Sequence, residues 1–246
     1  MQNLGLTRSS RQADHALFTP ESFVRAPWPG MKNATAIIHI SPAMGAAFTE
    51  YTVEFEAGGI LGSAVEQRFI FVLEGELTVA MPDKKVQLTP DMYAYIPAGA
   101  DAVVSAVRTS RALVIEKPYQ PHGDTQAPAF LTGNERTLTS QPLQGDDALQ
   151  VRSMLPDDPS FDFAVNTMSY QPGASLPAVE IHVMEHGLLM LSGGGIYRLN
   201  DKWYPVSAGD FIWMGPYCPQ WFGAIGKMPA KYIIYKDWNR HPLESL

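Results

Sequence analysis

The sequence predicts an all-β protein built from two tandem β-sandwich or β-barrel domains. Three observations lead to this prediction. Short runs of alternating apolar and polar residues recur along the chain, turn residues separate these runs, and the second half repeats the first. The 20 glycines and 20 prolines agree with many turns and with few helices. Many short strands at close spacing are typical of sandwiches and barrels.

The first domain is expected over residues 36–117, after an irregular N-terminal arm at 1–35. The arm contains Pro20, Pro27 and Pro29 and shows little periodicity. Runs that follow it alternate or are continuously apolar, and dipeptides such as Gly58-Gly59 and Pro82-Asp83 separate them. The expected strands are 36–40, 48–56, 68–73, 77–81, 86–88, 92–96, 102–107 and 112–116.

A linker is expected at 118–147, and a second domain at 148–246. The linker is rich in Pro, Gly, Gln, Thr and Asp. Beyond it, 163–173 aligns with 48–58, and 209–216 aligns with 90–97. The spacing between the copies changes from 115 residues in the first of these segments to 119 in the last. So small a change indicates a duplicated unit of about 100 residues.

Composition and charge exclude several classes of function. The net charge is −7 and the pI about 5.3, so no basic surface for nucleic acid is expected. The apolar runs are too short to span a membrane, and no signal peptide is evident. Cys218 is the single cysteine, which favours a reducing compartment. We therefore expect a cytoplasmic protein.

The strongest chemical signal is Glu180-x-His182-x3-His186, followed by an apolar run and Gly193-Gly-Gly. On a strand these three even-numbered residues would share one face, whereas Glu185 would point away. Two histidines and a carboxylate on one face can bind Mn, Fe, Ni or Zn and leave positions open for a substrate. Arg68 stands where the repeat would place His186, so we predict one metal per chain, in the second domain.

The glycine and ligand spacing resembles the two motifs of the cupin superfamily. These motifs read Gly173-x6-Glu180-x-His182-x3-His186-x6-Gly193 and Gly209-x6-Pro216-x3-Gln220. The usual cupin order is His, His, Glu and a later His, so the order Glu, His, His, Gln is a specific permutation. With the flanking segments 191–199, 210–221 and 232–240, the chain resembles the (S)-ureidoglycine aminohydrolases, which are bicupins with two jelly-roll β-barrels.

This resemblance implies a set of site residues. One Mn²⁺ per chain would be held by Glu180, His182, His186 and Gln220, and the substrate would meet Tyr197, Tyr232 and Lys236, as well as Gln220. Lys236 or Tyr232 would transfer protons. Taken alone, Lys236 would be interpreted as a solvated strand end and Tyr232 as a core residue. A lysine that points into an apolar barrel instead should have a lowered pKa or pair with a carboxylate.

The implied reaction converts (S)-ureidoglycine to (S)-ureidoglycolate and ammonia during purine and allantoin breakdown. Two alternatives stay open at this point: a metal-dependent bicupin dioxygenase and a non-catalytic ligand-binding bicupin. The expected partners are a small-molecule ureide and further copies of the chain. A homo-oligomer is expected because exposed sheet edges invite pairing.

Overall fold

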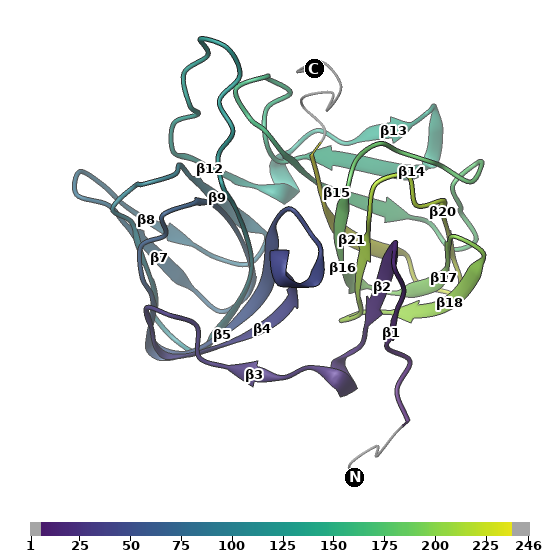
Figure 1. Cartoon of the computed structure of the whole chain (residues 1–246), viewed down its shortest axis with the longest axis horizontal. Helices are drawn as coiled ribbons and strands as arrows, with labels where there is room; N and C mark the ends of the chain where they lie inside the picture. The colour runs from purple at the N-terminus through teal and green to yellow at the C-terminus, as the bar shows by residue number, and fades with distance from the viewer. Residues whose placement is uncertain (1–5, 238–246) are drawn as a thin grey trace. The chain divides into compact units, whose positions relative to one another are not determined.

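The all-β prediction is confirmed by the computed structural model of the chain, which describes residues 6–237 (Figure 1). In this range the helical elements are three short 3-10 turns, at Pro20–Ser22, Pro42–Met44 and Glu135–Thr137. Across the same range we find no helix with the length and hydropathy needed to cross a membrane. The chain divides into two compact units. The N-terminal unit is Val24–Thr137, and the C-terminal unit combines the residues up to Phe23 with those from Leu138 onward.

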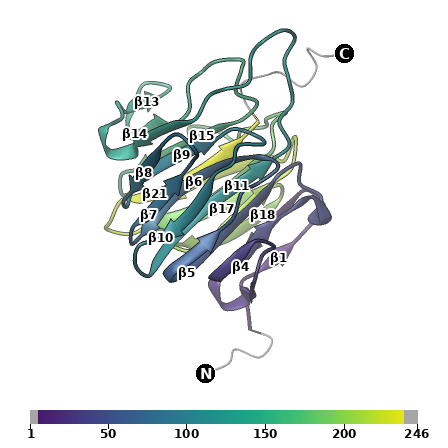
Figure 2. The same cartoon turned by 90° about the vertical axis from the view of Figure 1, so that its left-hand side faces the viewer.

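The N-terminal unit is one curled sheet in which strands distant in sequence lie side by side. Its strand order is β12-β9-β6-β11-β5-β10-β7-β8, with β4 paired to β5 and β3 to β4. Figure 2 shows β5, β10 and β7 running next to one another. The strands are β3 Arg25–Ala26, β4 Met31–Ile40, β5 Thr49–Leu61, β6 Gln67–Glu74, β7 Leu77–Ala80, β8 Lys85–Leu88, β9 Met92–Ile96, β10 Val103–Ala106, β11 Ser110–Lys117 and β12 Leu131–Asn134.

Alternation along these strands builds the core of this unit. Tyr51, Val53 and Phe55 on β5 are all buried and belong to one apolar cluster with Val114 on β11. Residues two apart on a strand point to the same face, so β5 commits one face to the core. The sequence pattern of 48–56 predicted this strand for the same reason.

The C-terminal unit has an eight-stranded sheet and a three-stranded sheet. The first follows the order β1-β2-β19-β16-β21-β15-β14-β13, and the second the order β18-β17-β20. The strands are β1 Ser10–Arg11, β2 His15–Phe18, β13 Gln141–Leu143, β14 Asp146–Ser153, β15 Ala164–Tyr170, β16 His186–Ser192, β17 Gly194–Leu199, β18 Lys202–Ser207, β19 Phe211–Met214, β20 Gln220–Ala224 and β21 Ala230–Lys236. The predicted second domain ran to residue 246, and its last residues, 238–246, lie outside the described range.

The predicted irregular arm at 1–35 is wrong, because strands form within it. Residues 15–18 form β2, which pairs with β19 and places His15 opposite Met214. Arg8 also belongs to this unit and donates two hydrogen bonds to the carboxylate of Asp210, at 2.6 and 2.8 Å. A four-residue strand is too short to show alternation, and its partner lies almost 200 residues away, so local patterns could not reveal it.

The predicted linker at 118–147 also contains structure. Residues 131–134 form β12, which pairs with β9 of the N-terminal unit, whereas β13 and the start of β14 belong to the C-terminal unit. The chain therefore passes between the units at Thr137–Leu138 and not across a free linker. The segment β12 reads Leu-Thr-Gly-Asn, which lacks the apolar alternation of a strand.

The duplication extends to the register of the strands. In the C-terminal unit His186 lies opposite Lys236, and Lys236 lies opposite Ala164. In the N-terminal unit Arg68 lies opposite Glu116 in the same strand pairing, and Glu116 lies opposite Thr49. Arg68 and Glu116 therefore occupy the places of His186 and Lys236, as the sequence repeat indicated for Arg68.

Candidate metal centre

The predicted ligand segment is held along β20 by backbone hydrogen bonds. Leu176 donates its N–H to the carbonyl of Phe222 at 2.9 Å. Glu180 and Gln220 then exchange two backbone hydrogen bonds, at 2.8 and 2.9 Å, in an isolated antiparallel bridge. Residues directly opposite in such a pair have neighbouring side chains on one face. Two predicted metal ligands, 40 positions apart in the sequence, are thus brought together by the backbone.

The prediction of one continuous strand through all three ligands is wrong. Glu180 is in an isolated β-bridge, whereas His182 is in no strand or bridge. The chain then bends, and β16 begins at His186. The carbonyl of His182 accepts a hydrogen bond from the backbone N–H of Tyr217 at 2.6 Å, which holds the bend in place. Side-chain alternation on a strand therefore does not explain why the donors converge. They converge because of the bend and the backbone hydrogen bonds that hold it.

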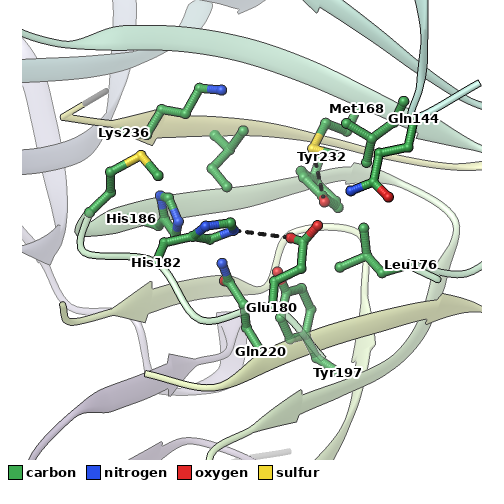
Figure 3. Close-up of a pocket in the computed structure, with 13 residues that line it drawn as sticks. Gln144, Met168, Leu176, Glu180, His182, His186, Tyr197, Gln220, Tyr232 and Lys236 are labelled. Carbon is green, nitrogen blue, oxygen red and sulfur yellow. Dashed lines mark hydrogen bonds and ion pairs between the residues drawn. The ribbon is translucent and has the colours of Figure 1, made fainter. Parts of the chain in front are cut away.

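The donors converge nonetheless, as Figure 3 shows. The Nε2 atom of His182 lies 3.1 Å from Oε2 of Glu180, and the rings of His182 and His186 are 5.5 Å apart between centroids. His186 is buried, and burial together with the charges of His182 and Lys236 lowers its pKa to about 3. Its imidazole is therefore neutral at physiological pH, the form that binds a metal.

Two buried polar atoms at this site lack any hydrogen-bond partner among the described residues. They are Nδ1 of His186 and Oε1 of Gln220. A buried polar atom without a partner costs about 1–3 kcal/mol, so such atoms call for an explanation. Two imidazoles, a carboxylate and an amide oxygen are donors that a divalent ion such as Mn²⁺ accepts. The side chains thus fit the metal that the sequence motif implies.

All seven predicted site residues line one cavity of about 300 Å³ in the C-terminal unit. Tyr197 enters it from β17, and Tyr232 and Lys236 enter it from β21. The four-residue separation of Tyr232 and Lys236 places both on the same face of β21, about 13 Å apart along the strand. The four predicted metal donors are Glu180, His182, His186 and Gln220. In Figure 3 they lie between Lys236 on one side and the Tyr232 end of the cavity on the other.

Burial shifts the pKa values of the other three predicted site residues, Tyr197, Tyr232 and Lys236, toward their neutral forms. It raises the pKa of Tyr197 and of Tyr232 well above the usual 10, so both phenols are neutral hydrogen-bond donors or acceptors. The Tyr232 hydroxyl lies 2.7 Å from that of Tyr170. Burial lowers the pKa of Lys236, although the negative charges of Asp157 and Glu180 partly offset this effect. The lysine that the sequence alone would place in solvent thus lies half-buried in the cavity.

The sequence did not single out several residues that complete the cavity wall. Leu143, Gln144, Met168 and Leu176 all line it. Met168 and Leu176 are apolar residues that look like ordinary core positions. Leu143 and Gln144 belong to the segment that was predicted to be a linker. Only the repeat alignment around 163–173 could have indicated the place of Met168, and no sequence signal marked Gln144.

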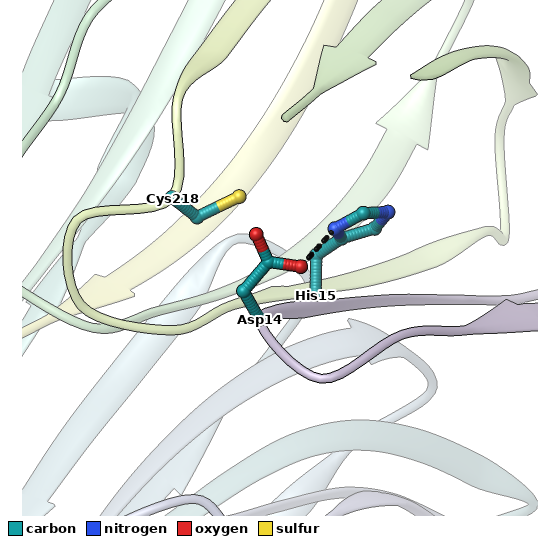
Figure 4. A group of neighbouring side chains, drawn as sticks. All are labelled: Asp14, His15 and Cys218. Carbon is teal, nitrogen blue, oxygen red and sulfur yellow. Dashed lines mark hydrogen bonds and ion pairs between the residues drawn. The ribbon is translucent and has the colours of Figure 1, made fainter. Parts of the chain in front are cut away.

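A second group of possible metal donors lies elsewhere in the C-terminal unit (Figure 4). Asp14, His15 and Cys218 are the only three His, Cys, Asp or Glu donors in the described range that all lie within 4.8 Å of one another. Glu180, His182 and His186 do not meet this spacing as a set of three, although Glu180 and His182 lie 3.1 Å apart.

The hydrogen bonds of this second group argue against a metal. Nδ1 of His15 lies 2.8 Å from Asp14 and Nε2 lies 2.9 Å from the hydroxyl of Tyr204, so both ring nitrogens are engaged. The second carboxylate oxygen of Asp14 accepts from Asn200 at 2.7 Å. Burial and the nearby Asp14 charge raise the pKa of the Cys218 thiol to about 11, which disfavours the thiolate that a metal requires. The group anchors the N-terminal segment to its unit.

Comparison with known proteins supports the family that the motifs resemble. A family model described as a cupin domain matches residues 166–235. A protein of Arabidopsis thaliana named (S)-ureidoglycine aminohydrolase is 40% identical over 97% of this chain and 80% of its own length. An Escherichia coli K12 protein of the same name is 33% identical over 94% of this chain and 90% of its own length.

A solved structure gives the same result at the level of the fold. The crystal structure of protein Ylba from Escherichia coli superimposes with a TM-score of 0.85 at 30% identity, covering 97% of each chain. The cupin fold that the motifs resemble is thus confirmed, and the chain divides into two units, as the repeat predicted. The identity and coverage of these relatives show that the chain belongs to the (S)-ureidoglycine aminohydrolase family, a family of cupin enzymes.

Proposed function

We propose that this protein is a Mn²⁺-dependent hydrolase that converts (S)-ureidoglycine and water to (S)-ureidoglycolate and ammonia in the breakdown of ureides. The observation that carries the proposal is the convergence of Glu180, His182, His186 and Gln220 on one cavity that also holds Lys236. Family membership supports the substrate, because relatives with 33–40% identity bear that activity in their names.

In this proposal Glu180, His182, His186 and Gln220 hold one metal ion per chain. A bound divalent ion would supply Lewis-acid polarisation and would fix chelating groups of the substrate. The unpartnered atoms Nδ1 of His186 and Oε1 of Gln220 support this ligand set. The N-terminal unit offers no equivalent set, since Arg68 and Glu116 fill the corresponding places and form an ion pair at 2.6 Å.

The reaction breaks the bond from the α-carbon to the amine nitrogen and forms a bond from that carbon to the oxygen of water. A proton must leave the water and a proton must reach the departing amine. We assign this transfer to Lys236 in preference to Tyr232. The lowered pKa of Lys236 makes its neutral amine more accessible near physiological pH, whereas the raised pKa of Tyr232 keeps its phenol protonated. Tyr197 and Tyr232 then orient the substrate as neutral phenols.

The deciding experiment measures ammonia release from freshly prepared ureidoglycine by purified protein stripped of metal and reloaded with Mn²⁺. We expect turnover with Mn²⁺, little turnover without it, and about one metal per chain. His182→Ala should remove metal and activity together. Absence of ammonia release from the loaded wild type would reject the proposed substrate, and activity that survives metal loss would reject the metal assignment.

A homo-oligomer and a cytoplasmic location remain part of this proposal. Light scattering coupled to size exclusion would give the mass of the assembly, and a mass of 27.1 kDa would show a monomer and contradict the first expectation. Fractionation of the source cells would test the second expectation.

A further inference from the structure

The hairpin between β13 and β14 brings an unusual residue to the cavity. Gln144 and Gly145 form its two-residue turn, with φ of 51° and 84°, and Leu143 lies opposite Asp146 on either side. Turns with two left-handed residues favour Asn, Asp and Gly, because a side chain with a Cβ atom is strained there. Three of the five non-glycine residues with positive φ in the described range are Asn or Asp, at 33, 91 and 200. Gln144 has no such conformational reason to be there.

The position of Gln144 supplies a second, independent observation. Its side chain lines the cavity, although the residue as a whole is exposed, so it lies at the cavity mouth. In Figure 3 its amide points inward beside Met168 and Tyr232. The predicted metal donors lie between this amide and Lys236. The structure gives this amide no hydrogen-bond partner among the described residues. A strained residue that directs an unpaired amide into a cavity suggests a functional role.

The residues around Gln144 indicate which chemical group of a bound molecule this amide could recognise. Met168 and Leu176 are apolar, and the Tyr232 hydroxyl is already engaged with Tyr170 and with the sulfur of Met168 at 3.2 Å. Gln144 is thus the polar group at this end with both donor and acceptor capacity unused. A carboxamide carries one carbonyl and one NH₂ side by side, and a terminal urea carries the same pair. The two can form parallel hydrogen bonds, in which each NH₂ donates to the other carbonyl.

We propose that Gln144 is the residue that recognises the terminal ureido group of the substrate. This inference rests on the proposed function and adds the direction in which the substrate lies. The ureido end faces the β13–β14 hairpin, and the carboxylate end faces the Lys236 side of the cavity. Selection of ureides over other α-amino acid derivatives then depends on one side chain at the hairpin tip.

The test compares two stable ligands that differ in one group. N-Carbamoylglycine ends in an NH₂ on its carbonyl, and N-acetylglycine ends in a methyl group at the same place. Binding of each to the Mn²⁺-loaded protein is measured by calorimetry, and inhibition of ammonia release is measured in parallel. We expect the wild type to bind N-carbamoylglycine about 3–10-fold more tightly, as one neutral hydrogen bond predicts. Gln144→Met should reduce that ratio to about one and raise the KM for ureidoglycine.

Two further variants separate recognition from folding. Gln144→Gly removes the amide but suits the positive φ, so it should be as stable as the wild type and should still lose the selectivity. Gln141→Met changes an exposed glutamine of the same hairpin that does not line the cavity, so it should keep the selectivity. Unchanged selectivity in both Gln144 variants would overturn the assignment.

The calorimetric measurement also separates this inference from the proposed function. If the wild type fails to release ammonia but binds N-carbamoylglycine selectively through Gln144, the proposed reaction is wrong and the recognition role stands. If the wild type releases ammonia but Gln144→Met and Gln144→Gly keep the ligand preference, the reaction stands and the recognition role is wrong.

Discussion

The buried ion pair of the N-terminal unit should be essential to stability and dispensable for metal binding. Arg68 and Glu116 have side chains that are 3% and 9% exposed, and their charged atoms lie 2.6 Å apart. The hydroxyl of Tyr51 donates a second hydrogen bond to Glu116 at 2.9 Å, and Arg68 also donates to the carbonyl of Gly62 at 2.8 Å. Arg68→Met removes the cation and leaves the carboxylate of Glu116 buried, with the Tyr51 hydroxyl still donating to it.

Removal of one partner from a buried pair costs about 3–5 kcal/mol. Tyr51 still stabilises Glu116, so we expect a loss near 3 kcal/mol. For a protein of this size that loss lowers the melting temperature by roughly 6–12 °C. Scanning calorimetry of the wild type and of the variant measures this shift.

The double variant Arg68→Met/Glu116→Met distinguishes an ion pair from a simple packing defect. Replacement of both charges by apolar groups of similar volume is often neutral or stabilising. The double variant should therefore recover most of the lost stability, and metal content should stay at about one per chain in both variants. A loss below 1 kcal/mol for the single variant, or no recovery in the double variant, would refute this reasoning.

Three further predictions concern the cavity, the second donor group and the response to pH. Lys236→Met should lower kcat by about 100-fold or more while metal content, measured by elemental analysis, remains unchanged, because Lys236 is assigned to proton transfer and is not a ligand; a loss of metal equal to the loss of activity would contradict that role. Cys218→Ser should leave metal content at the wild-type value, since the donors beside it are already hydrogen-bonded; a fall in bound metal would make that group a metal site. Burial, with a smaller effect from the charge of Arg111, lowers the pKa of His39 from 6.5 to about 3, so the unfolded chain binds a proton that the folded chain does not. The contribution of neutral His39 to the free energy of unfolding is therefore complete above about pH 6.5. It falls as the pH falls, by about 2 kcal/mol at pH 5. Chemical denaturation at several pH values should show a flatter profile for His39→Gln than for the wild type, and equal profiles would contradict the prediction.

The fold was predictable where neighbouring residues carry the information. The β5 segment shows its buried face in alternating residues, and Met92–Ile96 is bounded by turn residues, so both strands could be located from local pattern. The β2 segment could not be located in this way, because its four residues become a strand only by pairing with β19. Its stabilising contacts lie almost 200 positions away, and no local periodicity reports on them.

The candidate site was also predictable only in part, where residues close in sequence carry the information. That Glu180, His182 and His186 would converge could be predicted, because imidazole and carboxylate groups at short spacing indicate a shared site even when the backbone conformation is misjudged. The expected strand was in fact a bend, and yet the predicted donors still converge, because the bend and the Glu180–Gln220 bridge bring them together.

Gln144 could not be predicted, because its importance comes from backbone strain and position and not from residue type. A glutamine in a polar, glycine-containing segment is usually solvated, and only the positive φ and the inward-pointing amide distinguish this one. Metal ligands are constrained by chemistry that few residue types can supply, whereas recognition of a neutral urea requires only a donor and an acceptor, which many residues offer. Substrate selectivity of this protein should therefore follow the conformation of the β13–β14 hairpin more closely than it follows the metal ligands.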